Sequence, residues 1–404
     1  MKKVVFILVS LLSITVLATA QQANLSQAET AHYQVSSQNG ASDATAIANE
    51  MEAYFTLFNS YFHFDPATLQ AKLKVQVYSS QTDFNSYLSQ IIPGQRDSFV
   101  YLQYSDPARS VLVGFHGQNP DTFQTQLVHH GFVQFLKSFI PNPPLWLQEG
   151  FAVYFEKSTY DSAKDAAVYH PNLGWIPSLQ QGVSDFVSNK TDAVIAPESL
   201  LTIDASEANK KIQSFYAESW GLVSFLLNSD NKQYNRLLWD AIDALKPDAT
   251  VAQNETAIQT NALSWVEVTD LEQGFKDYID SVRTFPQLVQ DGMKAYSAGD
   301  AKSAESDFTR AVALDSSSYI PYYYLGLIHY ARKDYYLAEQ YFQTSLQMGG
   351  NAGLVNYALG VTAYADNRMS DAKKFLGQAA SLTDSTYKDQ ANSLLDRINS
   401  QSAQ

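Results

Sequence analysis

Residues 127–156 read LVHHGFVQFLKSFIPNPPLWLQEGFAVYFE, and this stretch carries the most informative pattern in the chain. Its apolar residues recur at helical spacing up to Phe139, and a run of prolines then ends the helix. A second helix is expected to open at Glu149 and to include Glu156. The stretch therefore predicts two consecutive helices, with two adjacent histidines on the first and an acidic residue opening the second.

The histidines and Glu149 have the spacing of a zinc-binding motif from which two members are missing. Two histidines four residues apart lie on one helical face and can bind one zinc ion together. In the motif H-E-x-x-H the glutamate takes a proton from metal-bound water, and a third ligand comes from the next helix. Here His129 stands at the first-ligand position and Glu149 at the third. His130 replaces the glutamate, and Val133 replaces the second histidine.

This region resembles the gluzincin type of peptidase MA-like metallopeptidase domain. The resemblance rests on the motif positions, the WLQEG frame at 146–150, the strand-like run 106–115 and the helix-like run 216–223, and it spans roughly residues 31–283. It implies a zincin-like fold with metal ligands at His129 and Glu149. It also implies a substrate cleft beside Glu149 and Tyr154 that could hold a peptide segment without cutting it.

The missing members argue against catalysis. Valine has no lone pair, so Val133 cannot bind a metal ion. His130 sits about 100° around the helix from His129, so the adjacent pair cannot easily chelate one ion. Pairing His130 with Gln134 restores the spacing, but glutamine is a poor zinc ligand. Because loss of a general base alone costs about 10²–10⁴ in rate, we expect no catalytic residue, no bound cofactor and at most a residual Zn²⁺ site at His129 and Glu149.

The chain from residue 287 to 386 carries an internal repeat of 34 residues. Five columns keep this period over three copies: Gly292, Gly326 and Gly360; Tyr296, Tyr330 and Tyr364; Ala304, Ala338 and Ala372; Phe308, Phe342 and Leu376; Ala311, Ser345 and Ala379. The pattern resembles the tetratricopeptide repeat family, in which each unit is a pair of antiparallel helices. Such units must stack to bury their apolar faces. Residues 387–399 are expected to form a terminal capping helix.

These patterns predict an α+β, mainly α chain with two folded parts. Alternation at 31–38, 73–77, 98–104 and 110–115 predicts a small, mostly antiparallel sheet with helices packed on it. The expected division is a signal peptide at 1–20, a peptidase MA-like domain with a degenerate zinc motif at 21–285, and three tetratricopeptide repeats with a capping helix at 286–404.

The first twenty residues have the pattern of a secretory leader. Lys2 and Lys3 precede an apolar run from Val4 to Leu17, and Ala18-Thr19-Ala20 offers a cleavage site. The run is too short to span a membrane comfortably, which disfavours a retained anchor. The chain has no cysteine, so lipoprotein attachment, disulfides and thiolate metal sites are excluded. We expect an exported protein, periplasmic or extracellular, without a membrane span after cleavage.

Charge and repeats together indicate the kind of partner. A net charge of −14 disfavours nucleic acid and anionic lipid. A repeat array offers a surface for a protein or peptide partner, and its tyrosines, including Tyr322, Tyr323 and Tyr335, are candidates to contact it, although about half of them should instead pack between repeats.

The expected function is an exported protein-interaction protein built from an inactive metallopeptidase-like domain and a repeat scaffold. One alternative is an active zinc-dependent metallopeptidase with an altered ligand set, drawn from His129, His130, His116 and Glu149. A further alternative is that the first domain only shapes or anchors the repeats.

Overall fold

The computed structural model describes residues 25–187, 197–382 and 386–402, and the chain divides into two compact units. The units are Met1–Val282 and Arg283–Gln404. The fold is α+β and mainly α, with a five-stranded sheet and helices in the first unit and paired antiparallel helices in the second. The leader expected at residues 1–20 lies outside the described residues, and no helix within them is long and apolar enough to cross a membrane.

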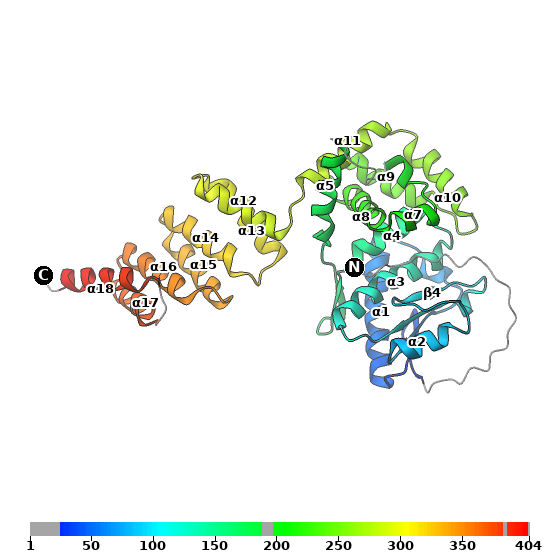
Figure 1. Ribbon diagram of the computed structural model, residues 1–404, viewed down its shortest axis with the longest axis horizontal. Helices are drawn as coiled ribbons and strands as arrows, with labels where there is room; N and C mark the ends of the chain where they lie inside the picture. Colours follow the sequence, from blue (N-terminus) through cyan, green and yellow to red (C-terminus); the bar gives the residue numbers. More distant parts are fainter. Residues whose placement is uncertain (1–24, 188–196, 383–385, 403–404) are drawn as a thin grey trace. The chain divides into compact units, whose positions relative to one another are not determined.

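The sheet of the first unit is mixed, with parallel strands at its centre (Figure 1). Its strands are β1 (Ser26–Glu29), β2 (Tyr33–Ser37), β3 (Leu73–Tyr78), β4 (Val100–Leu102) and β5 (Val111–Phe115), in the spatial order β1-β2-β3-β5-β4. β2, β3 and β5 run parallel, whereas β1 and β4 are antiparallel to their neighbours. The expectation of a mostly antiparallel sheet is wrong at the centre, because the helices after β2 and β3 are crossovers between parallel strands.

Helices cover both faces of this sheet, because successive residues of a strand point to opposite sides. On β5, Leu112 belongs to the large core, whereas Val111 and Val113 belong to a smaller one. The large core receives apolar side chains from α1 (Ala41–Phe62) and α3 (Pro120–Phe139). The smaller core is closed by α2 (Gln81–Leu88). The helix that carries the histidine pair is therefore fixed against the sheet.

The rest of the first unit is largely helical, and its central contact is between α4 (Leu145–Phe155) and α8 (Ile212–Asn228). Every residue of α4 is buried. A Cβ added at Gly150 would lie 2.5 Å from the backbone oxygen of Ser219, so this close packing requires glycine. The remaining elements are β6 (Thr159–Asp161), β7 (Ala166–Val168), α5 (Ile176–Val187), α6 (Pro197–Leu200), α7 (Ala205–Lys210), α9 (Lys232–Asp243), α10 (Val251–Ile258) and α11 (Val268–Ser281).

The second unit is a series of helix pairs that follows the 34-residue period. The pairs are α12 (Phe285–Ser297) with α13 (Ala301–Leu314), α14 (Tyr319–Ala331) with α15 (Tyr335–Gln347), and α16 (Ala352–Ala365) with α17 (Met369–Ser381), and α18 (Lys388–Ser402) packs on α17. Within each pair the glycine faces the large apolar residue of the second helix, Phe308, Phe342 or Leu376. A Cβ added at Gly326 would lie 2.5 Å from the ring of Phe342, so the period reflects close contact between paired helices.

Candidate functional site

Three residues of helix α3 that line the pocket lie on one face of the helix. Asn119 caps its start by accepting hydrogen bonds from the backbone amides of Asp121 and Thr122. Residues at intervals of four share a helical face, so His129, Val133 and Lys137 lie in one row. All three line the same pocket. The row thus holds a histidine, an apolar residue and a lysine, each one turn from the next.

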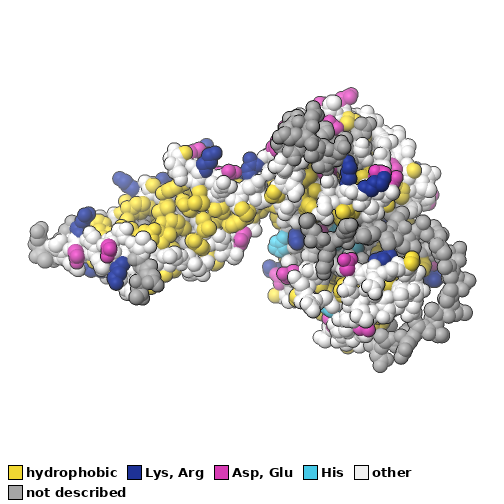
Figure 2. All heavy atoms as spheres, viewed as in Figure 1, with side chains coloured by type: hydrophobic (Ala, Val, Ile, Leu, Met, Phe, Trp, Pro, Cys, Tyr) yellow, Lys and Arg dark blue, Asp and Glu magenta, His cyan; other side chains and the backbone are white. Residues whose placement is uncertain are grey.

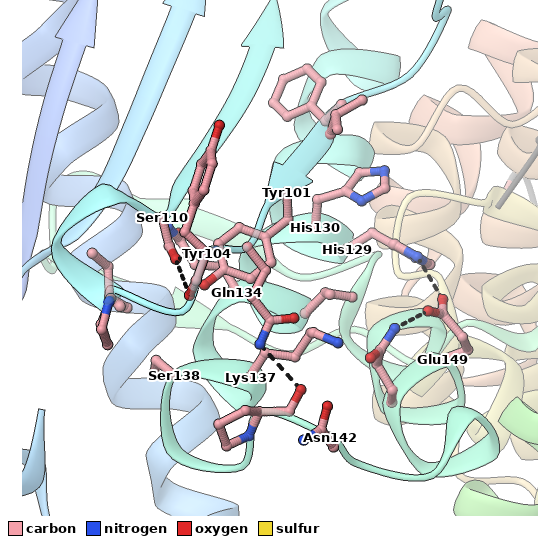
Figure 3. Close-up of a pocket in the computed structure, with 18 of the residues that line it drawn as sticks. Tyr101, Tyr104, Ser110, His129, His130, Gln134, Lys137, Ser138, Asn142 and Glu149 are labelled. Atoms are coloured by element: carbon pink, nitrogen blue, oxygen red, sulfur yellow. Dashed lines mark hydrogen bonds and ion pairs between the residues drawn. The ribbon is translucent and has the colours of Figure 1, made fainter. Parts of the chain in front are cut away.

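The imidazole of His129 lies between two carboxylates, those of Glu149 and Glu156, and Figure 3 shows its contact with Glu149. Its Nε2 atom is 3.2 Å from Oε2 of Glu149, and its Nδ1 atom is 3.3 Å from Oε2 of Glu156. The other oxygen of Glu149 accepts a 2.5 Å hydrogen bond from Gln148 Nε2, and that of Glu156 accepts a 2.7 Å bond from Asn172 Nδ2. Every carboxylate oxygen of this network therefore has a partner. His129 is 8% exposed and Glu149 is 1% exposed, so water screens the network little.

The two adjacent histidines have opposite electrostatic environments. Burial disfavours a charged His129, but its hydrogen bonds to Glu149 and Glu156 outweigh that cost and raise the pKa of His129 to about 9. For His130, burial and then the charge of His129 hold the pKa well below its ordinary value. At neutral pH the ring of His129 is therefore an imidazolium that donates from both nitrogens, while His130 is neutral.

The ring of His130 is turned away from the network. Its Nε2 atom lies 3.0 Å from Oγ of Ser98, and its plane is nearly parallel to the ring of Phe99 with a centroid distance of 6.3 Å. Figure 3 shows the ring of His129 directed toward Glu149 and the ring of His130 directed elsewhere. The adjacent pair therefore does not converge on one point.

These residues do not fit a zinc ion bound by protein side chains. A zinc site takes three or four protein ligands. Here Val133 has no donor atom, and in the parts of the chain that the structure describes no group of three or more His, Asp or Glu side chains is arranged to hold a metal. A carboxylate on the far nitrogen, as Glu156 provides for His129, also orients metal-binding histidines. Glu156 thus orients His129 as a carboxylate does at a metal site. The three or four ligands that a zinc ion needs are not found among the described residues.

A pocket of about 1240 Å³ opens beside the network, within the first unit. The edge strand β4 and its flanking residues line it, together with α3 and parts of α4, α7 and α8. Among the described residues strand β4 pairs with β5 alone, so within them its other edge has no strand partner. The pocket combines aromatic rings with carboxamides, including those of Gln134 and Gln148. Its lining suits a ligand with both apolar and hydrogen-bonding parts.

Two residues expected at or near the site lie elsewhere. Tyr154 is 3% exposed and does not line the pocket; its ring stacks on Tyr169 with a centroid distance of 4.7 Å. Its expected role in contacting a peptide is corrected to one in the core. His116, considered as a substitute ligand, has its Nε2 atom 3.1 Å from Oδ2 of Asp43 and does not line the pocket. The altered ligand set of His129, His130, His116 and Glu149 is therefore not brought together.

The tyrosines of the second unit occupy different environments. Tyr322 is half-buried, and its hydroxyl donates to the backbone oxygen of Ser316 at 3.2 Å. Tyr323 is half-buried, with its ring centroid 5.7 Å from that of Phe342, and Tyr335 lies 5.9 Å from Tyr330. These three rings thus combine packing inside the array with partial exposure. The adjacent Tyr336 is 72% exposed.

Sequence reasoning missed Lys137 and Glu156 as members of the site. Lys137 follows His129 by two helical repeats of four residues, and Glu156 follows Glu149 by two turns, but this spacing alone does not mark either residue as part of a site. Comparison with known proteins adds no further residue. No family model matches the chain, and no curated protein matches it.

Proposed function

We propose that the chain is an exported polypeptide-binding protein in which a zincin-like, metallopeptidase-like domain no longer cleaves and a tetratricopeptide array provides a second binding surface. The observation that carries the proposal is the His129–Glu149 contact beside Val133. The first- and third-ligand positions of a gluzincin motif face each other, while the second-ligand position has no donor. The site keeps a cleft and lacks the chemistry of hydrolysis.

The cleft suits an extended peptide. A strand edge without a partner presents backbone N–H and C=O groups, and peptides bind such edges as an added strand. The edge of β4 has no strand partner, and residues of β4 line the pocket. Aromatic side chains such as Tyr101 and Tyr104 also line it and offer apolar surface for alternate side chains of a bound peptide.

The second unit supports the repeat part of the proposal. Its paired antiparallel helices and 34-residue period support a tetratricopeptide array. Figure 2 shows apolar side chains gathered over the face of this unit that the view presents. Exposed apolar residues of the unit are Met293, Leu314, Tyr336, Leu337 and Met348. Apolar surface of this kind marks protein interaction sites.

Peptide binding without cleavage tests this function. A pool of fluorescein-labelled peptides, titrated with the full chain, should show saturable anisotropy, and mass spectrometry should find the peptides intact after prolonged incubation with added zinc. Cleavage that a chelator stops would establish the metallopeptidase instead. For the array, a Tyr336→Ser, Leu337→Ser variant should capture fewer polypeptides from envelope extracts than wild type, with Lys302→Ser as a surface control.

A further inference from the structure

The ammonium group of Lys137 is a cation in the pocket without a direct partner. Its Nζ atom makes no hydrogen bond or ion pair with any described residue, although its side chain is only partly exposed. Figure 3 shows the side chain extending from α3 on the side where Glu149 lies. Glu149 makes no hydrogen bond or ion pair with Lys137; its oxygens bond to His129 and Gln148, and its charge acts on Lys137 only from a distance. A partly buried cation without a direct partner is costly, so an anionic ligand group would be favoured there.

Two unpartnered acceptors lie in the same pocket lining. Gln134 is 1% exposed and donates through Nε2 to the backbone oxygen of Lys74 at 2.8 Å, but its Oε1 has no partner. Gln148 is 6% exposed and donates to Glu149, and its Oε1 also has no partner. Carboxamide oxygens accept hydrogen bonds from N–H groups. Both oxygens are enclosed, each with less than 1 Å² of accessible surface, so the group that the open part of the pocket would bind is the anion at Lys137.

Other cations near the pocket are already engaged. The guanidinium of Arg96 donates to the backbone oxygens of Gln95 and Pro93. The imidazolium of His129 is bonded to Glu149 and Glu156. Lys137 is therefore the pocket cation best placed to bind an incoming anion.

We propose that Lys137 binds the C-terminal carboxylate of a peptide that lies extended along β4, so that the pocket recognises polypeptide ends. This inference rests on the proposed polypeptide-binding function and names the part of the polypeptide that is bound. A chain terminus supplies the carboxylate for Lys137, and its extended backbone supplies the N–H and C=O groups for the edge of β4, which lines the same pocket.

The test compares three pools of N-terminally fluorescein-labelled hexapeptides by anisotropy with the full chain. The first pool contains only uncharged residues and has a free C-terminal carboxylate. The second has the same residues and an amidated terminus, and the third is amidated but contains one glutamate. We expect the free-acid pool to bind at least about tenfold more tightly than either amidated pool, the size expected for one charge-assisted hydrogen bond. The Lys137→Met variant should lose this preference, and Lys232→Met, which removes an exposed charge outside the pocket lining, should keep it.

The outcomes separate this inference from the proposed function. Equal binding of the free-acid and amidated pools to wild type would overturn the role of Lys137 while leaving peptide binding intact. Tight binding of the glutamate pool would assign the site to side-chain carboxylates and overturn recognition of the terminus. Binding of none of the pools would remove the peptide-binding function of the pocket itself. If Lys137→Met does not fold, competition on wild type by unlabelled free-acid and amidated peptides gives the same comparison.

Discussion

The Nε2 atom of His129 lies 3.2 Å from Oε2 of Glu149, a separation that suits a proton as well as a metal ion. Two ligands of a tetrahedral zinc ion at about 2.0–2.1 Å are also roughly 3.3 Å apart, so this distance does not by itself distinguish the two occupants. The number of donors does distinguish them, because Val133 supplies none. We therefore infer that a proton on His129 holds the two groups together in this chain.

The charge on His129 should make the stability of the first unit depend on pH. Its folded pKa of about 9 exceeds the value of about 6.5 for an unfolded histidine. The stabilisation is fully present below pH 6.5 and is lost as the pH rises through 9, with a loss of about 1–3 kcal/mol in the free energy of unfolding. Urea denaturation between pH 6 and 9.5, followed by tryptophan fluorescence, measures it, since Trp146 and Trp220 are buried in this unit.

The control for this trend is His129→Gln. Its free energy of unfolding should be lower than that of wild type at pH 6. It should not show the decrease that wild type shows as the pH rises through 9. Burial lowers the pKa of Lys137 to about 8, so Lys137 adds the opposite trend above that pH, but it does so in both proteins. The difference between wild type and variant therefore isolates His129. Parallel pH profiles for the two proteins would show that His129 is not charged in the folded state.

The glycine column of the repeats should tolerate no side chain. In Gly326→Ala the new Cβ would meet the ring of Phe342 at 2.5 Å, and overpacking of this kind costs about 1–3 kcal/mol. Gly377→Ala is the matched control, because a Cβ there meets nothing within 4 Å and alanine favours a helix interior. Thermal melts should show a lower midpoint for the first variant and an unchanged or higher one for the second. Equal effects would contradict the proposed packing of paired helices.

Substitutions at two tyrosines of the array should show which ring packs inside it and which is free to contact a partner. Tyr323 packs on Phe342, so Tyr323→Ala should lower the free energy of unfolding by about 1–3 kcal/mol. Tyr336 is 72% exposed, so Tyr336→Ser should change stability by less than about 0.5 kcal/mol. Chemical denaturation of the full chain measures both. A large loss in the Tyr336 variant would mean that its ring is covered in solution.

The sequence predicted best those elements whose contacts join residues close to one another in the chain. Helical spacing around His129 predicted α3, and the runs at 98–104 and 110–115 pair antiparallel as β4 and β5. A helix was also predicted at Glu149, but α4 begins four residues earlier, at Leu145, directly after the prolines. The parallel centre of the sheet was not predicted, because strand direction depends on how crossover helices return the chain. The burial of Tyr154 was also missed, although a residue five positions after Glu149 lies about 140° around the helix from it. The ring of Tyr154 packs on Tyr169 instead of facing the pocket.

The roles of Lys137 and Glu156 needed the structure for another reason. Lysines and glutamates on helices are usually solvated, so spacing alone gives no cause to assign them to a site. Only the three-dimensional contacts reveal that Lys137 has no direct partner among the described residues, and only the position of Glu156 reveals why His129 is charged.

Zinc content of a restored motif tests the central claim most directly. After dialysis against zinc-containing buffer and then buffer alone, wild type should hold less than about 0.1 zinc per chain, because its ligand set is incomplete. Val133→His should raise this to about one zinc per chain without hydrolysis, and adding His130→Glu should give peptide cleavage that a chelator stops. Stoichiometric zinc in wild type, lost in the His129→Ala, Glu149→Ala double variant, would contradict the account.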